Sequence, residues 1–292
     1  MIRQMNERIV NIINPAAGQG KVPSRFDGEI YTTKCRGDAE EYVEGLCRDA
    51  EQPLFLRVFG GDGTLGEVVT GIMRSGRNDN VRLSAVPTGT GNDFVRAFEG
   101  KSGEHRIDVM KVGDRYAVNV ANTGFDCRVV VKAGELKKKP LISGSMAYVL
   151  GVVQTLLGKL GEDMRVEYTD ENGETNIIED KLLLVVCANA PYHGGGFKAA
   201  PLADYSDGLL EMLIVPKVSR LQFISLVADY RSGRHLDPDT GAPIERFKDI
   251  VTYRRIKSIK VTGLELACAD GEVRDADSME ISVIPGALRV VF

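Results

Sequence analysis

The stretch Gly60-Gly61-Asp62-Gly63-Thr64 stands between a predicted strand and a predicted helix. Residues 54–59 form an apolar run with the length of a buried strand. The apolar residues after the turn repeat with the spacing of one helix face: Leu65, Val68, Val69, Ile72 and Met73. Glycine lets the backbone approach a ligand, and a helix start offers unpaired N–H groups, so this turn can bind phosphate. Asp62 would then need Mg²⁺ or a ribose hydroxyl between itself and the phosphate. Taken alone, the turn also fits a plain strand–helix connection with a capping aspartate.

The composition is typical of a soluble globular protein. The chain has 292 residues, 43% of them hydrophobic and 27% charged, which allows one large domain or two of ordinary size. Its net charge of −4 gives no basic field, so we expect no nucleic-acid partner. The five cysteines are scattered without a Cys-x-x-Cys pair, which fits a cytoplasmic location. No apolar run approaches the roughly 20 residues of a membrane-spanning helix.

Two further polar, glycine-bearing loops follow predicted strands in the N-terminal part. Asn14-Pro15-Ala16-Ala17-Gly18-Gln19-Gly20-Lys21 follows the strand at 9–13, and Pro87-Thr88-Gly89-Thr90-Gly91-Asn92-Asp93-Phe94 follows the strand at 81–86. Between them, a short strand at 29–32 precedes a helix that begins at an Asp38-x-x-Glu41 capping box. Strands that alternate with helices predict a parallel sheet, whose ligands bind at the carboxyl ends of the strands. The two loops and the Asp62 turn all fall at that edge.

After about residue 105 the pattern changes to short strands with turns between them, which predicts an antiparallel sandwich or barrel. The predicted strands lie near residues 107–109, 116–120, 164–168, 182–187, 209–215, 256–261, 264–268 and 279–284. Two predicted helices interrupt these strands. The helix at 145–160 is apolar over most of its circumference, and the helix at 219–232 begins at a Ser219-x-x-Gln222 capping box.

Two acidic stretches in the C-terminal part are candidates for chemistry. Asp204 and Asp207 lie three residues apart in a loop that continues with Gly208 and Leu209, and such carboxylates suit a hard cation with oxygen ligands. Asp270-Gly271-Glu272 follows an apolar strand, where two carboxylates could hold a metal or act as a general base. Taken alone, the first stretch also fits a solvated acidic turn, and the second fits a hairpin turn.

In their order along the chain, six motifs resemble those of the diacylglycerol kinase catalytic family, which includes sphingosine and ceramide kinases. The chain is most similar to the small bacterial lipid kinases of that family. The motifs span nearly the whole chain: Asn14-Pro15-x-x-Gly18, Thr33-x-x-x-Gly37-Asp38-Ala39, the turn at 60–64, Gly89-Thr90-Gly91-Asn92-Asp93-Phe94, Asp207-Gly208-Leu209 and Asp270-Gly271-Glu272.

The resemblance implies an α/β domain followed by a β domain. An NAD-kinase-like, nucleotide-binding α/β domain with a parallel sheet is expected over residues 1–106, and the C-terminal strand can return to it. An antiparallel β-sandwich domain with added helices, which takes the lipid, is expected over residues 107–292. The resemblance also implies transfer of the γ-phosphoryl group of ATP to a lipid hydroxyl, with Mg²⁺, in the cleft between the domains.

The motifs and the resemblance together assign the site residues. ATP-binding residues are expected at Asn14, Pro15, Ala16, Ala17, Gly18, Thr33, Gly60, Gly61, Asp62, Gly63, Thr64, Glu67, Thr90, Asn92 and Asp93. Asp62 and Asp93 are expected to reach the Mg²⁺ of the nucleotide, directly or through water. A separate, structural Mg²⁺ is expected on Asp204, Asp207 and the carbonyl group of Leu209.

Glu272 and Asp270 are the predicted catalytic residues. We favour Glu272 as the proton acceptor, because its longer side chain can reach across a cleft toward a lipid hydroxyl. Asp270 would then orient that hydroxyl or a metal-bound water molecule. Alanine at either position should lower kcat far more than it changes the KM for ATP.

Two features depart from the family pattern. Residues 22–29 are too few and too broken to form the helix that usually follows the first loop. Gly66 stands where an asparagine commonly precedes the glutamate, here Glu67, of the helix after the Asp62 turn. Neither change removes a charged group that the chemistry needs.

A lipid kinase must touch the bilayer without spanning it, so we expect peripheral contact with the inner face of the membrane. Lys137-Lys138-Lys139, followed by Pro140-Leu141-Ile142 and the apolar helix at 145–160, predicts a patch attracted to anionic headgroups. A solvated lysine run beside an ordinary core helix fits the same residues equally well. Dimers are common among members of the family, so a homodimer is a further expectation.

Two other functions fit parts of the sequence. An NAD kinase would share the Asp62 turn and the metal requirement, but the Asp207 and Asp270 motifs favour a lipid substrate. A catalytically inactive, lipid-binding regulatory protein would not need the carboxylate set Asp62, Asp93, Asp207, Asp270 and Glu272. Any lipid with a hydroxyl beside an apolar tail fits the sequence, including diacylglycerol, a sphingoid base and phosphatidylglycerol.

Overall fold

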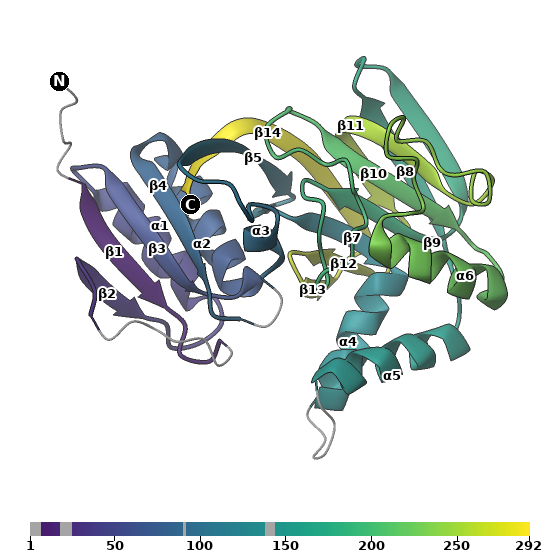
Figure 1. Ribbon diagram of the computed structural model, residues 1–292, viewed down its shortest axis with the longest axis horizontal. Helices are drawn as coiled ribbons and strands as arrows, with labels where there is room; N and C mark the ends of the chain where they lie inside the picture. The colour runs from purple at the N-terminus through teal and green to yellow at the C-terminus, as the bar shows by residue number, and fades with distance from the viewer. Residues whose placement is uncertain (1–6, 18–24, 90–91, 138–143) are drawn as a thin grey trace.

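The computed structural model of the protein describes residues 7–17, 25–89, 92–137 and 144–292. Figure 1 shows an N-terminal part in purple and blue beside a larger C-terminal part in teal, green and yellow. The yellow C-terminal strand runs back between them and ends at the N-terminal part. The strands of the described residues belong to one sheet of 14 strands. Among the described residues, no helix combines the length and the apolar character needed to cross a bilayer.

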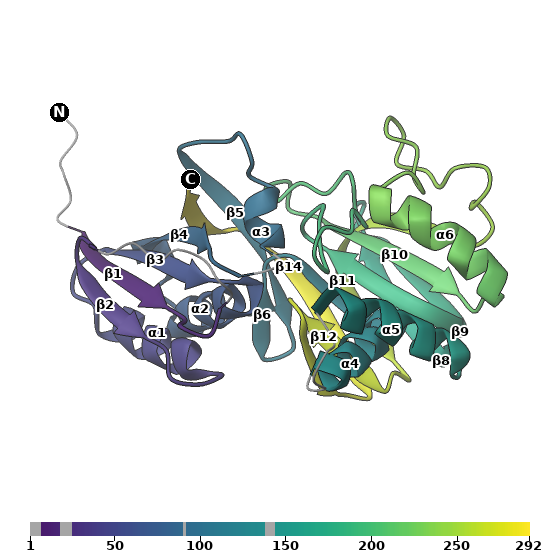
Figure 2. The same ribbon diagram turned by 60° about the horizontal axis from the view of Figure 1, so that its bottom comes forward.

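Parallel strands form the N-terminal part, as the alternation of strands and helices predicts. From the outer edge they are β2 (Glu29–Thr32), β1 (Arg8–Ile13), β3 (Leu54–Gly60), β4 (Val81–Pro87) and the end of β14 (Ser278–Val291). Val290 of β14 pairs with Leu83 of β4. Helices α1 (Asp38–Asp49) and α2 (Asp62–Ser75) cover one face of these strands (Figure 2), and the 3₁₀ helix η1 (Asn78–Asn80) follows α2.

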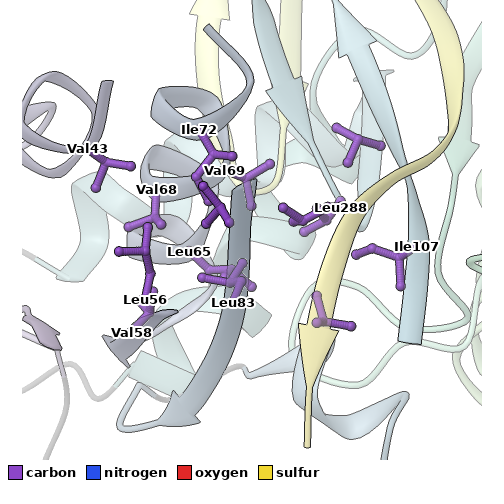
Figure 3. Packing of buried hydrophobic residues seen from close by; sticks show 14 of the residues in the cluster. Val43, Leu56, Val58, Leu65, Val68, Val69, Ile72, Leu83, Ile107 and Leu288 are labelled. Carbon is purple, nitrogen blue, oxygen red and sulfur yellow. The ribbon is translucent and has the colours of Figure 1, made fainter. Parts of the chain in front are cut away.

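Figure 3 shows how apolar side chains join α1 and α2 to the sheet. Both helices contribute to a buried cluster, and the residues of α2 in it lie at the spacing that the sequence predicts. The cluster includes Val43, Leu56, Val58, Leu65, Val68, Val69, Ile72, Leu83, Ile107 and Leu288. Because Leu288 belongs to β14, the end of the chain helps to close the N-terminal core.

The start of α1 differs from the prediction. The expected capping box of Asp38 and Glu41 is wrong, because the N-cap residue is Gly37 and its position offers no side-chain hydrogen bond to the helix. Asp38 is instead the first helical residue. Its carboxylate accepts hydrogen bonds from the N–H of Lys34 (2.8 Å) and the hydroxyl of Tyr31 (3.0 Å).

The face of the parallel sheet opposite α1 and α2 is reached by the segment before β2. The described part of that segment, residues 25–28, forms no helix, in agreement with the prediction. Asn11 of β1 is buried, and its side-chain nitrogen donates hydrogen bonds to the carbonyl oxygens of Asp27 (2.9 Å) and Glu29 (3.0 Å). A buried amide therefore holds this loop against the strand.

The C-terminal part is antiparallel, as predicted. It contains the first half of β14 and β5 (Glu104–Val112), β6 (Arg115–Ala117), β7 (Val120–Gly124), β8 (Glu162–Asp170), β9 (Thr175–Ala188), β10 (Leu210–Pro216), β11 (Thr252–Thr262), β12 (Leu266–Ala269) and β13 (Glu272–Asp275). β8 pairs with β9 and β11, and β10 lies between the same two strands, so these four strands close into a ring. A second apolar core draws residues from all four. The expected domain boundary after residue 106 falls within β5 and stays a prediction.

The described residues of the C-terminal part form the helices α4 (Phe125–Lys137), α5 (Gly144–Leu157) and α6 (Arg220–Ser232). The two predicted helices are confirmed as α5 and α6, and α6 carries the predicted capping box of Ser219 and Gln222. α4 is a helix that the sequence analysis missed. α4 and α5 form a hairpin that extends from the sandwich in Figure 1. They approach closely at Gly151, where a Cβ atom would lie 3.1 Å from the carbonyl oxygen of Val129.

Candidate active site

A cleft of about 1070 Å³ opens between the carboxyl ends of the parallel strands and the β12–β13 hairpin, with α4 on a third side. Many of the predicted site residues line it: Asn14, Pro15, Ala16, Ala17, Thr33, Gly61, Asp62, Gly63, Thr64, Glu67, Asp270 and Glu272. Gly18 and Thr90 lie outside the described residues. The fold therefore brings the two predicted groups of site residues to one place, while their roles stay predictions.

The turn between β3 and α2 forms one wall of the cleft. Because α2 begins at Asp62, its first N–H groups have no partner within the helix, and such groups can bind a ligand. A Cβ atom on Gly89 would lie 2.6 Å from the Cα atom of Gly61, and one on Gly60 would lie 2.6 Å from the Cβ atom of Thr64. Glycine at position 89 lets the ends of β3 and β4 approach each other, and glycine at position 60 leaves room for Thr64 in the first turn of α2.

Asn14 ties the first loop to the same turn. Its side-chain nitrogen donates a hydrogen bond to the hydroxyl oxygen of Thr64 (2.8 Å), and its side-chain oxygen accepts one from the N–H of Ala16 (2.9 Å). Pro15 and Ala17 continue along the cleft. The first loop and the Asp62 turn thus form one continuous surface. Together with Thr33 and Glu67, which also line the cleft, we call it the N-terminal wall.

Asp62 connects this wall to the short helix α3 (Asp93–Arg96). Its carboxylate oxygens accept hydrogen bonds from the N–H groups of Asp93 (3.1 Å) and Phe94 (3.2 Å). Burial raises the pKa of the Asp62 carboxyl above its usual value, and these hydrogen bonds oppose that rise. A cation beside Asp62 would also favour its ionised form.

Asp93 and Asn92 lie behind the N-terminal wall rather than in its surface. The Asp93 carboxylate accepts hydrogen bonds from the N–H of Gly195 (2.7 Å) and the guanidinium group of Arg96 (2.9 Å). The Asn92 side-chain nitrogen donates to the carbonyl oxygen of Gly89 (2.8 Å). In this arrangement Asp93 joins α3 to a loop of the C-terminal part.

Glu67 lines the cleft, yet its carboxylate is engaged with the backbone. Its oxygens accept hydrogen bonds from the N–H groups of Gly37 (2.9 Å) and Ala39 (3.3 Å) at the start of α1. Glu67 therefore accepts hydrogen bonds from N–H groups at the start of α1, which is the role that the prediction gave to the capping box. It also fixes the loop that brings Thr33 and Arg36 to the cleft.

Asp270 and Gly271 form the turn of the β12–β13 hairpin. Their φ angles of 45° and 85° are both positive, as a type I′ turn requires at its two central residues. The Asp270 carboxylate accepts hydrogen bonds from the N–H groups of Val118 (2.7 Å), Asn119 (2.9 Å) and Val120 (2.9 Å). Burial raises the pKa of Asp270 to about 6 against the effect of these bonds. Asp270 thus holds the hairpin to the start of β7.

Glu272 is held by side chains instead. Its Oε2 accepts a hydrogen bond from Nη1 of Arg115, and its Oε1 accepts one from Nε of Arg36 (3.3 Å). Arg115 also donates to Glu40 of α1 (2.9 Å). Glu272 lines the cleft and its side chain is 19% exposed. Of the two predicted catalytic carboxylates, Glu272 is therefore the more accessible to a substrate.

The acidic loop at 204–209 lies outside the cleft. Asp204 accepts a hydrogen bond from the N–H of Ser206 (2.9 Å), and Asp207 accepts one from the N–H of Leu209 (2.9 Å) and one from Arg255 (2.5 Å). Within the described ranges, no group of three or more His, Cys, Asp and Glu side chains is placed to hold a metal ion. The structural Mg²⁺ expected at this loop stays a prediction.

Asp108 of β5 is a buried carboxylate that the sequence analysis missed. It accepts hydrogen bonds from the N–H groups of Gly208 (2.7 Å) and Gly286 (2.7 Å), so it joins the acidic loop to β14. In the same loop, the Tyr205 hydroxyl donates to the side-chain oxygen of Asn119 (2.9 Å). Because Asn119 also binds Asp270 through its N–H, the acidic loop and the hairpin share one hydrogen-bonded network.

The sequence analysis also missed the cations at the cleft. Within the described residues, Lys34 and Arg36 are the cationic side chains that line it. Their place inside the Thr33-x-x-x-Gly37 motif is the signal that could have found them. Arg115 carries no such signal, because it lies 157 positions from Glu272 in the sequence. The third side of the cleft comes from residues of the missed helix α4: Val130, Val131, Gly134 and Glu135.

Two family models match the chain and together cover nearly all of it. Residues 8–123 match the family described as the diacylglycerol kinase catalytic domain, and residues 119–292 match the YegS C-terminal NAD kinase beta sandwich-like domain. A diacylglycerol kinase of Mycobacterium tuberculosis strain H37Rv is 28% identical over 316 residues, covering 97% of this chain and 94% of that protein. A diacylglycerol kinase of Staphylococcus carnosus is 28% identical over 255 residues, covering 82% of this chain and 76% of that protein.

A solved structure of a diacylglycerol kinase from Bacillus anthracis strain Sterne has the same fold. It superimposes with a TM-score of 0.66 at 22% identity, and the match covers 98% of this chain and 97% of that one. At this identity the likeness shows the fold alone. The predicted fold class, an α/β part with a parallel sheet followed by an antiparallel sandwich, is confirmed.

Proposed function

The chain belongs to the diacylglycerol kinase catalytic family and is a lipid kinase, and on this premise we propose that it transfers the γ-phosphoryl group of ATP to a lipid hydroxyl. One observation carries the proposal: the start of α2 and the Glu272 carboxylate line the same cleft. The first can bind the phosphates of the donor, and the second can accept the proton of the acceptor. The names of the relatives favour diacylglycerol as that acceptor.

The donor nucleotide would lie along the N-terminal wall. The free N–H groups at the start of α2 suit its phosphates, and Asn14 holds the first loop beside them. Thr33 and Glu67 belong to the same wall, with Glu67 acting through the loop that it fixes. In this assignment the wall mainly positions the reactants, which is the principal task of a protein in phosphoryl transfer.

The residues of the cleft suit Mg²⁺ that arrives with ATP. Asp62 offers a carboxylate at the cleft surface. Behind that surface, Asn92 has a buried side-chain oxygen without a partner in the described residues. Mg²⁺ in kinases is commonly held by one or two carboxylates together with the substrate phosphates. When bound, it would neutralise charge on the transferring phosphoryl group. Asp93 would act indirectly, by holding α3 in place.

Glu272 is the proposed proton acceptor, and Asp270 is the proposed positioning residue. Asp270 already accepts three backbone hydrogen bonds, which use most of the roughly four acceptor sites of a carboxylate. Its contribution would therefore be to keep the hairpin, and with it Glu272, in position. This assignment replaces a direct role of Asp270 on the hydroxyl.

An apolar face on α5 and α6 offers a place for the membrane that supplies the lipid. Val149, Val153 and Leu157 follow one another at helical spacing on α5 and are 61%, 47% and 74% exposed. Leu221 at the start of α6 is 81% exposed, and the end of α5 lies beside it through the hydrogen bond from Arg220 to the carbonyl oxygen of Leu156 (2.7 Å). The two helices can be followed in Figure 2.

Basic residues border this face, which suits an anionic bilayer surface. The groove beside it is lined by Lys159, Lys181, Lys217 and Arg220. Lys138 and Lys139 of the predicted lysine patch lie outside the described residues. Replacing both Val149 and Leu157 by aspartate should weaken binding to anionic vesicles, and unchanged binding would contradict a membrane role for this face. The homodimer, the cytoplasmic location and the structural Mg²⁺ at Asp204 and Asp207 remain predictions.

A lipid-extract assay tests the proposed function. The protein is incubated with a total bacterial lipid extract, Mg²⁺ and ATP labelled in the γ-phosphoryl group, and label is measured in the organic phase. The proposal expects a labelled lipid product with the wild-type chain and at least about 100-fold less with Asp62→Asn, since loss of an electrostatic contact at the transferring group has effects of this size. Equal labelling by the two proteins, or none by the wild type, would refute it.

A further inference from the structure

Both carboxylate oxygens of Glu272 accept a hydrogen bond from an arginine. Oε1 is paired with Nε of Arg36, and Oε2 with Nη1 of Arg115. A general base must come within hydrogen-bond distance of the hydroxyl whose proton it takes. Departure of one arginine would free one oxygen of Glu272 for that contact.

The two arginines are held to different degrees. The Arg115 side chain is 27% exposed, and it bridges Glu272 and Glu40, which in turn pairs with Arg74. The Arg36 side chain is 69% exposed and contacts Glu272 through a single longer bond of 3.3 Å. Exposed ion pairs contribute little to stability and exchange readily, whereas an arginine between two carboxylates is fixed. Arg36 is therefore the partner that can leave.

Arg36 also lies beside the proposed phosphate site. Its loop is fixed to α2 by the hydrogen bond from the N–H of Gly37 to Glu67 (2.9 Å). A small cavity of about 50 Å³ has Arg36 and Glu272 in its lining together with Gly63 of the first turn of α2. The arginine thus contacts the predicted base and lines the same cavity as the helix start that would bind the phosphates.

Once a nucleotide enters the cleft, charge favours movement of Arg36 from Glu272 to the phosphates. Lys34 and Arg36 are the cationic residues that line it in the described parts of the chain. A guanidinium group matches the geometry of phosphate oxygens, and a polyphosphate carries more negative charge than a single carboxylate. The phosphates would therefore compete successfully with Glu272 for Arg36.

We propose that Arg36 is a phosphate-binding catalytic residue that exchanges Glu272 for the γ-phosphoryl group of ATP, while Arg115 is a positioning residue that keeps Glu272 in place. This inference rests on the proposed function. The lipid oxygen forms a bond to the γ-phosphorus, the bond to the bridging oxygen of ADP breaks, and the hydroxyl proton passes to the freed Oε1 of Glu272. Binding of ATP is thereby coupled to the release of Glu272 Oε1 from its bond to Arg36.

The test compares two nucleotides that differ in the γ-phosphoryl group. Affinities for ADP and for the non-hydrolysable imido analogue of ATP are measured by calorimetry with Mg²⁺ on the full chain. Arg36→Gln should weaken the affinity for the analogue about 10- to 100-fold, the size expected for a charge-assisted hydrogen bond. It should change the affinity for ADP by less than about twofold. Arg36→Lys should restore part of the loss because it keeps the charge.

Two further variants complete the test. Arg115→Gln tests the positioning of Glu272, and Arg48→Gln is a control for effects of removing a surface arginine. Arg115→Gln should lower kcat in the lipid assay without changing the affinity for either nucleotide, since Arg115 acts through Glu272. Arg48→Gln is the matched control: Arg48 is 60% exposed and pairs with Glu44 on the same helix, away from the cleft. It should behave as the wild type in both measurements, and melting curves of all variants report whether they fold.

The outcomes distinguish this inference from the function on which it rests. If Arg36→Gln binds the analogue as tightly as the wild type, or loses ADP affinity to the same degree, Arg36 does not contact the γ-phosphoryl group and the inference is wrong, while the kinase function stands. If Arg115→Gln keeps its kcat, the positioning role is wrong. A wild-type chain that binds neither nucleotide would refute the proposed function itself.

Discussion

The two walls of the cleft are held in place by different interactions. On the N-terminal wall, the carboxylates of Asp62 and Glu67 both accept hydrogen bonds from backbone N–H groups at helix starts. The β12–β13 hairpin lines the cleft with residues 270–273, which we call the hairpin wall. On this wall, Glu272 is paired with the guanidinium groups of Arg36 and Arg115. One wall is therefore fixed by the main chain, and the accessible carboxylate of the other is fixed by side chains.

This difference separates a rigid surface from an adjustable one. The N-terminal wall cannot change without disturbing the starts of α1, α2 and α3, so it is suited to bind phosphates in one arrangement. Arg36 is exposed and its ion pair with Glu272 costs little to break, so Glu272 can lose this one partner when a substrate arrives while Arg115 stays in place. Asp270 marks the boundary between the two kinds of support, since it belongs to the hairpin but is bound by backbone N–H groups.

The largest expected effect comes from Glu272→Gln. The variant keeps the size of the side chain but removes the proton acceptor, so kcat should fall by about 10²- to 10⁴-fold, the usual contribution of general acid–base catalysis. The affinity for ADP should change little, and the affinity for ATP should not weaken, because the variant removes the carboxylate that competes with the phosphates for Arg36. Steady-state kinetics with ATP and lipid vesicles measures both. Glu245→Gln is a suitable control, because that side chain is 87% exposed. Near-normal kcat in Glu272→Gln would place the base elsewhere.

A second substitution, Gly89→Ala, tests whether the N-terminal wall is rigid. Gly89→Ala places a Cβ atom 2.6 Å from the Cα atom of Gly61, so we expect a loss of about 3 kcal/mol in the free energy of unfolding together with weaker ATP binding. Gly45→Ala in α1 is the control, because its Cβ atom would meet nothing within 4 Å. It should stabilise the chain by up to about 1 kcal/mol. Urea unfolding and calorimetry measure the effects; an unaffected Gly89→Ala variant would show that this wall is not rigid.

Asp270→Asn sharpens the comparison within the hairpin. An amide nitrogen would face one of the backbone N–H groups that the carboxylate now binds, so the free energy of unfolding should fall by about 2 kcal/mol. Glu272→Gln should cost less than about 1 kcal/mol, since its partners are partly exposed. Urea titrations at pH 7 compare the two. Equal losses would contradict the distinction between main-chain and side-chain support.

The smallest expected effect is a dependence of stability on pH. It sets the pH range in which the variants of the two walls should be compared. His235 is fully buried, and burial lowers its pKa to about 4. Its neutral form therefore stabilises the fold above pH 6.5, and this stability is lost as the pH falls from 6.5 toward 4. The wild type should lose about 1 kcal/mol relative to His235→Gln between pH 7 and pH 5.5. If the difference between the two proteins stays constant with pH, His235 does not titrate in this way.

Much of the N-terminal wall could be predicted because its signals are local. The apolar run, the glycines and the helical repeat around Asp62 lie within about twenty residues, and the structure follows them closely. The turn at Asp270 and Gly271 is local for the same reason. Where the local reading failed, at the start of α1, a carboxylate from another helix, Glu67, binds the N–H groups that Asp38 was expected to serve.

Helix α4 and the ion pairs at Glu272 depend on distant contacts instead. Val129, Val130 and Val131 form a β-branched run that locally favours a strand, and the helix they adopt packs closely on α5 at Gly151. Arg36 lies 236 positions from Glu272. No pattern within a short window contains either contact, so the third side of the cleft and the support of the predicted base became visible only in the folded chain.

The most direct test of the central claim offers the chain two acceptors side by side. With Mg²⁺ and ATP labelled in the γ-phosphoryl group, diacylglycerol in anionic vesicles and soluble NAD are supplied together, and label is counted in the organic and aqueous products. A lipid kinase built on these two walls should place the label in phosphatidic acid, with Glu272→Gln reducing it to near background. Label in NADP, or labelled lipid that is unaffected by the loss of Glu272, would contradict the account.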